Sequence, residues 1–263
     1  MRQHGFSLVE LSIVLVILGL LAGGILGGQS LMHAAALRNV SVQLQVYETA
    51  ILSFKDRYFY LPGDMPNAVD FWGIAAGATG DDATCRAAIS TDGTTCNGDG
   101  NGIVGTYGTT VNNIPSGNEA LRSYQHLANA GLISGNFTGV HAGKIEPGIN
   151  VPRTTFNDVG MAFFFRNSYA IWGKAAHALQ LGTPSTFNQL WGGAFTPEDA
   201  WNLDSKLDDG KPNTGKVMGH DGLSAPFCHV GGSADVQTPD PSIDYTYELT
   251  YDSRDCQLYY WID

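Results

Sequence analysis

Glu10 is a carboxylate placed near the start of a long apolar stretch. Phe6 to Leu31 would measure about 39 Å as a helix, which is enough to cross the hydrocarbon core of a bilayer. No Asp, Glu, Lys or Arg occurs from Leu11 to Leu37. A carboxylate in lipid costs several kcal/mol unless a positive group pairs with it, so Glu10 is a candidate functional residue.

Two ordinary explanations fit this segment less well. A secretory signal peptide has a short apolar core that ends in small residues at a cleavage site, whereas this apolar run is longer and carries an acid near its start. A plain membrane anchor accounts for the length but not for the carboxylate. The sequence therefore predicts a membrane helix in which the carboxylate of Glu10 has a function.

Three oxygen-bearing side chains in the glycine-rich middle of the chain are candidate metal ligands. Asn97, Asp99 and Asn101 are each followed by glycine, as at the start of a calcium-binding loop. The twelfth position would be Gly108 in place of glutamate, so the usual bidentate ligand is missing. A turn held by Asn and Asp side chains is the favoured alternative, with calcium as the candidate cofactor.

Asp204, Asp208 and Asp209 form the densest acidic cluster of the chain. Thr196 is the expected cap of a helix that ends near these residues, at Gly210. Acidic side chains at a helix C-terminus oppose the helix dipole. A second calcium site is therefore a hypothesis here, beside the simpler interpretation of an exposed helix end.

Four cysteines are consistent with an oxidising compartment. They contain no C-x-x-C pair, which argues against a zinc or thioredoxin-like site. Of the three possible pairings, the one that closes two local loops joins Cys85 to Cys96 and Cys228 to Cys256. Four buried free thiols, which a cytosolic location would favour, are the alternative.

Composition and motifs argue against two functional classes. The net charge is −11, with 25 acidic against 14 basic residues and no basic run, unlike a typical nucleic-acid-binding protein. Gly-x-Ser-x-Gly, His-Glu-x-x-His and the full phosphate loop Gly-x-x-x-x-Gly-Lys-Ser/Thr are absent. We predict that the chain is not an enzyme.

The N-terminus matches a known pattern. It resembles the prepilin cleavage and methylation motif of type IV pilins and type II secretion pseudopilins, in the segment Gly5-Phe6-Ser7-Leu8-Val9-Glu10. The resemblance implies that an inner-membrane prepilin peptidase cuts between Gly5 and Phe6, that Phe6 is then N-methylated, and that Glu10 pairs with the N-terminus of a neighbouring subunit. Gly5 would be required because the peptidase admits almost no side chain there.

One departure from the pilin pattern lies midway along the helix, where many pilins carry a proline. This chain has none there and carries five glycines instead: Gly19, Gly23, Gly24, Gly27 and Gly28. Glycines at every fourth position permit close packing of membrane helices. They also weaken a helix, so the segment at 19–28 is a candidate for melting when the subunit enters a filament.

The helix is expected to continue beyond the membrane as an amphipathic segment. Apolar residues recur at steps of three and four, at Leu37, Val40, Leu44, Tyr47, Ile51, Phe54 and Tyr58. It should stop before Leu61-Pro62-Gly63-Asp64, a segment similar to the Pro-Gly-Asp turn that follows the helix in many pseudopilin-like proteins. A long helix with a membrane half and a supporting half is the architecture that pilins use.

The C-terminal part is expected to combine short helices with an antiparallel sheet. A capping box at 116–119 predicts a helix from Ala120 to Ala130, with His126 in a structural role. Runs at 161–165 and 169–172 suggest a buried β-hairpin, and aromatic runs at 245–249 and 257–262 suggest strands. The predicted fold class is α+β, pilin-like, with the helix packed on the sheet and long loops outside.

The expected domain organisation follows from these segments. We predict a leader at 1–5, a transmembrane and assembly helix at 6–31, the amphipathic half at 32–60 and a globular domain at 61–263. Arg2 is the only charge in the leader and should remain cytoplasmic, which places the globular domain in the periplasm. The expected location is the bacterial inner membrane and then a filament.

The resulting functional prediction is a structural subunit, and a minor one, of a type IV pilus or a related filament. Its partners would be the inner membrane, the prepilin peptidase, other pilin subunits and the assembly platform. The alternatives are a type II secretion pseudopilin, a binding module or adhesin at a filament tip, and an anchored periplasmic enzyme.

Overall fold

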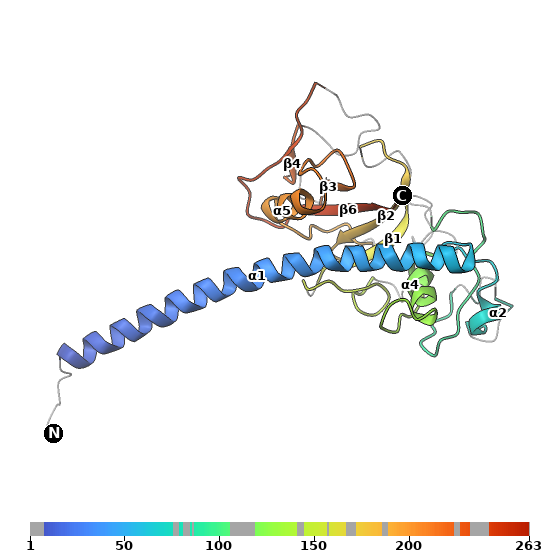
Figure 1. Ribbon diagram of the computed structural model, residues 1–263, viewed down its shortest axis with the longest axis horizontal. Coiled ribbons are helices and arrows are strands. Elements are labelled where there is room, and N and C mark those ends of the chain that lie inside the picture. The colour runs from blue at the N-terminus through green and yellow to red at the C-terminus, as the bar shows by residue number, and fades with distance from the viewer. Residues whose placement is uncertain are drawn as a thin grey trace.

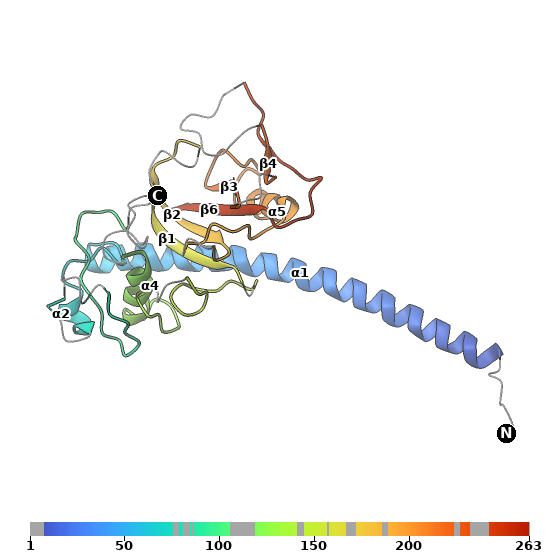
Figure 2. The ribbon, with the colours of Figure 1, turned by 180° about the vertical axis from the view of Figure 1, so that it is seen from behind.

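A computed structural model describes residues 8–75, 79–80, 85, 87–105, 119–140, 145–156, 158–166, 172–185, 189–223, 227–231 and 242–262. The N-terminal half of α1 projects away from a globular domain, as both views show (Figures 1 and 2). The helices in chain order are α1 (Leu8–Tyr58), α2 (Val69–Trp72), α4 (Glu119–Asn129) and α5 (Pro197–Leu207). The strands are β1 (Gly160–Arg166), β2 (Ala176–Gly182), β3 (Val217–Asp221), β4 (His229–Val230), β5 (Thr246–Tyr247) and β6 (Cys256–Ile262).

The 51-residue helix α1 ends where the sequence predicts. Phe59, the next residue, takes a left-handed backbone conformation with a φ of 63°, and its N–H still donates to the carbonyl of Lys55. Pro62 and Gly63 follow and turn the chain back toward the domain. Gly63 has a φ of 92°, a conformation that glycine adopts without strain.

The C-terminal half of α1 packs on the domain through the predicted apolar stripe. Leu37, Val40, Leu44, Ile51 and Phe54 are buried, and the two tyrosines of the stripe pack against the same core while partly exposed. A helix that buries only one face needs such a stripe, with a period near 3.6 residues. The stripe thereby confirms the amphipathic half of the long helix.

Polar contacts fix the position of α1 along the sheet. Glu48 accepts hydrogen bonds from Lys216 Nζ and from the Tyr260 hydroxyl, both at 2.5 Å, so one carboxylate joins the helix to the residue before β3 and to β6. Nearer the free end, His33 Nε2 lies 2.8 Å from Asp199 Oδ1 at the start of α5. The helix is thus tied at two points about four turns apart.

The main sheet has the antiparallel order β1-β2-β6-β3, which confirms the α+β, pilin-like fold class. Alternate residues of β6 serve two different cores, because successive side chains of a strand point to opposite faces. Leu258 and Tyr260 join the large core that includes the α1 stripe. Tyr259 and Trp261 pack in a smaller aromatic core on the other face, together with Trp172.

The predicted β-hairpin is wrong in its second strand. β1 forms as expected, but it pairs with Ala176–Gly182 and not with the run at 169–172. Trp172 lies in a turn with a φ of 48°, and residues 169–171 are outside the described residues. The large side chain of Trp172 fills the aromatic core, which explains an apolar residue in this turn. Its indole N–H donates to the Gly219 carbonyl at 3.0 Å.

The other predicted elements differ mainly in length. α5 starts at Pro197, and its cap Thr196 accepts a hydrogen bond from the Asp199 N–H at 3.1 Å, as expected. α4 begins at Glu119, while residues 116–118 of the predicted capping box are outside the described residues. The strand expected at 245–249 is only the two-residue β5, which pairs with β4.

Two disulfides close local loops in the oxidised structure. Cys85 is bonded to Cys96, and Cys228 to Cys256, which is the pairing that closes the shortest loops. The second disulfide joins the segment before β4 to the first residue of β6. It therefore fastens the β4–β5 ribbon to a central strand of the main sheet.

Candidate functional sites

The first half of α1 projects away from the domain (Figure 1), and its apolar side chains are exposed around its whole circumference. Within the described part of the chain, α1 is the one helix long and apolar enough to cross a membrane, judged by length and composition. A helix that is apolar on all sides needs a nonpolar environment such as lipid or a bundle of other helices. The exposed residues are Leu8, Val9, Leu11, Ile13, Val14, Leu15, Val16, Ile17, Leu18, Leu20, Leu21, Ile25, Leu26, Leu31 and Met32.

Glu10 lies in the first turn of α1 on this exposed apolar segment. A negatively charged side chain in the first turn of a helix interacts favourably with the helix dipole. The predicted cleavage and methylation residues Gly5 and Phe6 are outside the described residues. Their roles, and the pairing of Glu10 with another subunit, remain predictions.

The glycines of α1 pack against no other part of the described chain. The helix is continuous from Gly19 to Gly28, and a Cβ atom built at any of its five glycines would meet no other atom within 4 Å. Larger residues would therefore fit in the isolated subunit. Both explanations of the glycines, close packing with other helices and melting on assembly, remain predictions.

A group of three carboxylates lies where the Pro-Gly-Asp turn, the glycine-rich loop and α4 meet. One carboxylate oxygen from each of Asp64, Asp99 and Glu119 lies within 4.8 Å of the other two. The backbones approach closely here, because a Cβ at Gly98 would lie 2.3 Å from the Gly63 carbonyl oxygen. Glycines at these positions thus allow three distant segments to bring their acids together.

Hydrogen bonds within this acidic group link its three segments. Glu119 is buried and accepts hydrogen bonds from the N–H groups of Asp99, at 3.1 Å, and Gly105, at 3.0 Å. Asp64 accepts one from the Gly102 N–H at 3.0 Å, and the Gly100 N–H donates to the Asp64 backbone carbonyl at 2.9 Å.

The electrostatics of the acidic group favour protons or a cation. The pKa of Asp64 is raised to about 6 and that of Glu119 to about 7, mainly by burial, and the negative charge of Asp99 contributes to both shifts. Hydrogen bonds from backbone N–H groups oppose these shifts. A carboxyl whose folded pKa is raised stabilises the fold progressively as the pH falls through that pKa.

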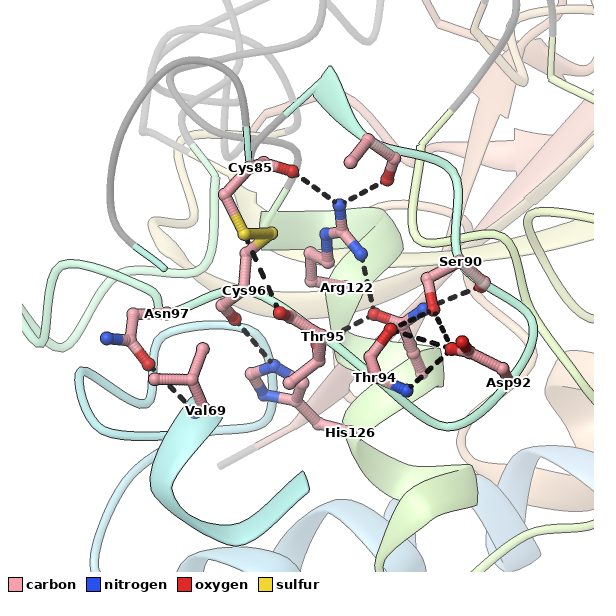
Figure 3. The surroundings of a disulfide bond; sticks show 12 residues. Val69, Cys85, Ser90, Asp92, Thr94, Thr95, Cys96, Asn97, Arg122 and His126 are labelled. Atoms are coloured by element: carbon pink, nitrogen blue, oxygen red, sulfur yellow. Dashed lines mark hydrogen bonds between the residues drawn. A yellow bond between two sulfur atoms is a disulfide. The ribbon is translucent and has the colours of Figure 1, made fainter. Parts of the chain in front are cut away.

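The predicted calcium loop is only partly brought together. Asp99 belongs to the acidic group, but Asn97 accepts a hydrogen bond from the Val69 N–H of α2 at 3.0 Å instead (Figure 3). Asn101 donates to Asp99 Oδ2 and accepts from the Ile103 N–H, as in an Asx turn. Asp64 and Glu119 were missed because they are distant in sequence and meet Asp99 only in the fold.

The second predicted acidic site, at Asp204, Asp208 and Asp209, is a second group of neighbouring carboxylates. Asp204 is buried and accepts hydrogen bonds from the Tyr247 hydroxyl at 2.8 Å and the Gly210 N–H at 3.1 Å. Burial raises its pKa to about 7. The other two acids accept hydrogen bonds from residues 211–217, so all three close the loop after α5. Calcium binding here remains a prediction.

The loop after α5 also contains a partial phosphate-loop spacing. Gly210, Gly215 and Lys216 fit Gly-x-x-x-x-Gly-Lys, but Val217 stands where the hydroxyl residue would be. The segment leads from a helix to a strand, whereas a phosphate loop leads from a strand into a helix. Lys216 donates a hydrogen bond to Glu48 of α1, so the segment helps to hold the long helix on the domain.

His126 holds the Pro-Gly-Asp turn against the first disulfide loop. Its Nδ1 accepts a hydrogen bond from the Gly63 N–H at 2.9 Å, which leaves Nε2 to donate to the Cys96 carbonyl at 3.1 Å (Figure 3). The ring must be neutral to make both bonds. Burial lowers the pKa of His126 to about 3, so the structural role expected from the sequence is confirmed.

The His126→Phe variant should be less stable than the wild-type protein at pH 7.5, by about 2–4 kcal/mol, because two buried backbone groups lose their partner. The difference should shrink below pH 6.5, since protonation of the histidine in the unfolded chain then opposes folding of the wild type only. We expect a decrease of about 1.4 kcal/mol per pH unit between pH 6 and 4. Urea unfolding of both proteins across this range measures it, and a constant difference would contradict a neutral buried histidine.

Arg122 is buried, and its guanidinium lies beside the first disulfide (Figure 3). The Arg122 guanidinium donates to the carbonyls of Cys85 and Ala88 and to the Gln125 side chain. Burial lowers the pKa of Arg122 to about 10. Arg122 thus satisfies carbonyl groups of the disulfide loop and directs its hydrogen bonds there.

The fold and the apolar end of α1 define the class of this chain. A long N-terminal helix, exposed and apolar over its first half, packs its second half on a C-terminal antiparallel sheet. This is the α+β layout of pilin-like proteins, and in this layout the chain resembles type IV pilins and pseudopilins. Residues 1–26 match the family described as the prokaryotic N-terminal methylation motif, the prepilin-type cleavage and methylation signature. Comparison with curated proteins and with solved structures gives no match.

Proposed function

We propose that this chain is a structural, minor subunit of a type IV pilus or a similar filament, matured by prepilin peptidase and N-methylated at Phe6. The observation that carries the proposal is the division of α1 into an exposed apolar half and a docked half. The exposed half would first lie in the inner membrane and then in the helical core of the filament. Each fully buried Leu, Ile or Val side chain contributes about 1.5–3 kcal/mol when it leaves water.

Glu10 would set the register between neighbouring subunits. In a nonpolar helix bundle an unpaired carboxylate is strongly unfavourable, so subunits should stop where a neighbour's methylated N-terminal amine reaches Glu10. Cleavage after Gly5 creates that amine at Phe6. Processing would therefore produce the group that the assembly step needs.

The globular domain would lie in the periplasm before assembly. The two disulfides are compatible with that oxidising compartment. Arg2 is the only charge in the leader and favours a cytoplasmic N-terminus. The partners would be the peptidase, other pilin subunits and the assembly platform in the inner membrane.

A type II secretion pseudopilin has the same maturation and the same helix, so the test must separate the two systems. Cells expressing the tagged chain are sheared, and surface filaments and membranes are probed for its processed form. Recovery in sheared pili, lost in a strain without the pilus assembly platform, supports the pilus. Retention in the membrane, with a secretion defect on deletion of the chain, would overturn it in favour of a pseudopilin.

A binding role at the filament tip is the second candidate. Phe227 and Tyr251 stack with ring centroids 4.4 Å apart beside the second disulfide, and both are exposed. Exposed aromatic pairs are common in contact surfaces. A Phe227→Ala, Tyr251→Ala protein that assembles normally but no longer adheres to surfaces would support this candidate, and unchanged adhesion would exclude this surface.

A further inference from the structure

Asp64, Asp99 and Glu119 face one another from three separate segments of the chain. Asp64 follows the end of α1, Asp99 lies in the glycine-rich loop, and Glu119 begins α4. One carboxylate oxygen from each lies within 4.8 Å of the other two. Three negative charges at this separation repel one another unless a cation or protons neutralise them.

Asp64 adds an observation that does not depend on the clustering. Its side chain is 1% exposed, and its Oδ1 accepts no hydrogen bond from the described part of the chain. Oδ2 of the same carboxylate accepts the Gly102 N–H. Buried polar atoms in folded proteins almost always have a partner, so the lone pairs of Oδ1 call for a ligand in the acidic group.

No cation of the described protein supplies this partner. The ion pairs among the described residues join other carboxylates, at Glu48, Asp158, Asp199, Asp221 and Asp244. Arg122, one turn along α4 from Glu119, directs its hydrogen bonds to the disulfide loop. The neutralising group is therefore a proton, for example one shared between Asp64 and Asp99, or a cation from outside the described residues.

We propose that Asp64, Asp99 and Glu119 bind one calcium ion. Carboxylate oxygens are ligands of hard divalent cations. Calcium lies about 2.4 Å from its ligands, so two oxygens that share one ion are at most about 4.8 Å apart, and each pair among the three oxygens lies within that distance. Magnesium, at about 2.1 Å, requires oxygens no more than about 4.2 Å apart and a stricter octahedron.

The proposed ion would join the end of α1 to α4 and to the glycine-rich loop. These segments already share hydrogen bonds, such as that from the Asp99 N–H to Glu119. A calcium ion would convert their mutual repulsion into attraction and stabilise the domain. The proposal does not depend on filament assembly, because it concerns the fold of a single subunit.

The test uses full-length protein in detergent, freed of metal with a chelator and then titrated with calcium chloride. Calorimetry should show one site whose affinity depends on Asp99, and the melting temperature should rise by about 5–10 °C at a calcium concentration 100-fold above the Kd of that site. The Asp99→Asn variant should lose at least tenfold in affinity. Without calcium it should melt at the same temperature as the wild type or higher, because the substitution removes one repelling charge and keeps the shape of the side chain.

A matched control removes the same charge from the other acidic group. The Asp209→Asn variant should bind calcium as the wild type does. An unchanged calcium response in Asp99→Asn, or its loss in Asp209→Asn alone, would overturn the proposed ligands. No rise in melting temperature up to about 10 mM calcium, beyond the range of weak extracellular sites, would overturn the site itself. An equal affinity for magnesium would overturn the assignment to calcium.

Discussion

The Gly5→Val protein should remain at full length in cells that contain active prepilin peptidase. The proposed cleavage site lies between Gly5 and Phe6, and the peptidase would accommodate a residue without a side chain at Gly5. Valine adds a branched side chain at that position, so the uncut chain should accumulate in the membrane and be absent from sheared filaments. Mobility on gels and N-terminal sequencing measure the fraction that is cut, and we expect a fall of at least 100-fold.

The size of the side chain should determine the defect. Gly5→Ala adds a single methyl group and should slow processing less than valine does. Gln3→Ala, two residues earlier in the leader, is a control that should be processed normally. Efficient cleavage of the valine variant at the same bond would contradict the assignment of Gly5.

The Glu10→Ala protein should be processed but should fail to assemble. Removing one member of a buried charge pair costs about 3–5 kcal/mol, because the other charge is left without a partner in a nonpolar environment. Each 1.4 kcal/mol is a factor of ten in an association constant, so the loss per subunit contact exceeds 100-fold. The amount of processed protein in sheared filaments, relative to the membrane fraction, measures the effect.

Two variants separate the charge of Glu10 from other properties of the helix. Glu10→Asp keeps the charge and should retain part of the assembly. Ser12→Ala removes a nearby hydroxyl whose hydrogen bond goes to the Val9 carbonyl of the same helix, so it should assemble normally. Normal assembly of Glu10→Ala would show that the carboxylate does not set the register.

The helices could be predicted because the residues that define their buried faces and their ends lie within them or next to them. The stripe from Leu37 to Phe54 and the stop at Pro62 lie within α1 and just after it, so they predicted its docked face and its end. Thr196 likewise predicted the start of α5, since a cap acts on N–H groups three residues away.

The sheet was less predictable because strand pairing depends on tertiary contacts. The run at 169–172 is more apolar than Ala176–Gly182, yet the latter pairs with β1. β2 lies in the interior of the sheet and buries Leu179 and Leu181 against the large core, while Gln180 is satisfied by the Tyr259 hydroxyl across the strand. A polar residue that finds a buried partner is not distinguishable from an exposed one in the sequence.

The group formed by Asp64, Asp99 and Glu119 was likewise only partly predictable from the sequence. Asp99 was predicted as a metal ligand from the local sequence, because Asn and Asp alternate with glycine there. Asp64 and Glu119 appeared only as parts of a turn and a helix start, since their proximity depends on close backbone contacts at Gly63 and Gly98. Ligands drawn from three segments require the fold to be known.

The most direct test of the central claim is the intact mass of the protein from membranes, under non-reducing conditions, with and without prepilin peptidase. With the peptidase we predict the loss of Met1 to Gly5 and the gain of one methyl group on Phe6. The mass should also lack four hydrogens, as the two disulfides require. A full-length, unmethylated chain in the presence of active peptidase would contradict the account and leave an anchored domain of another function.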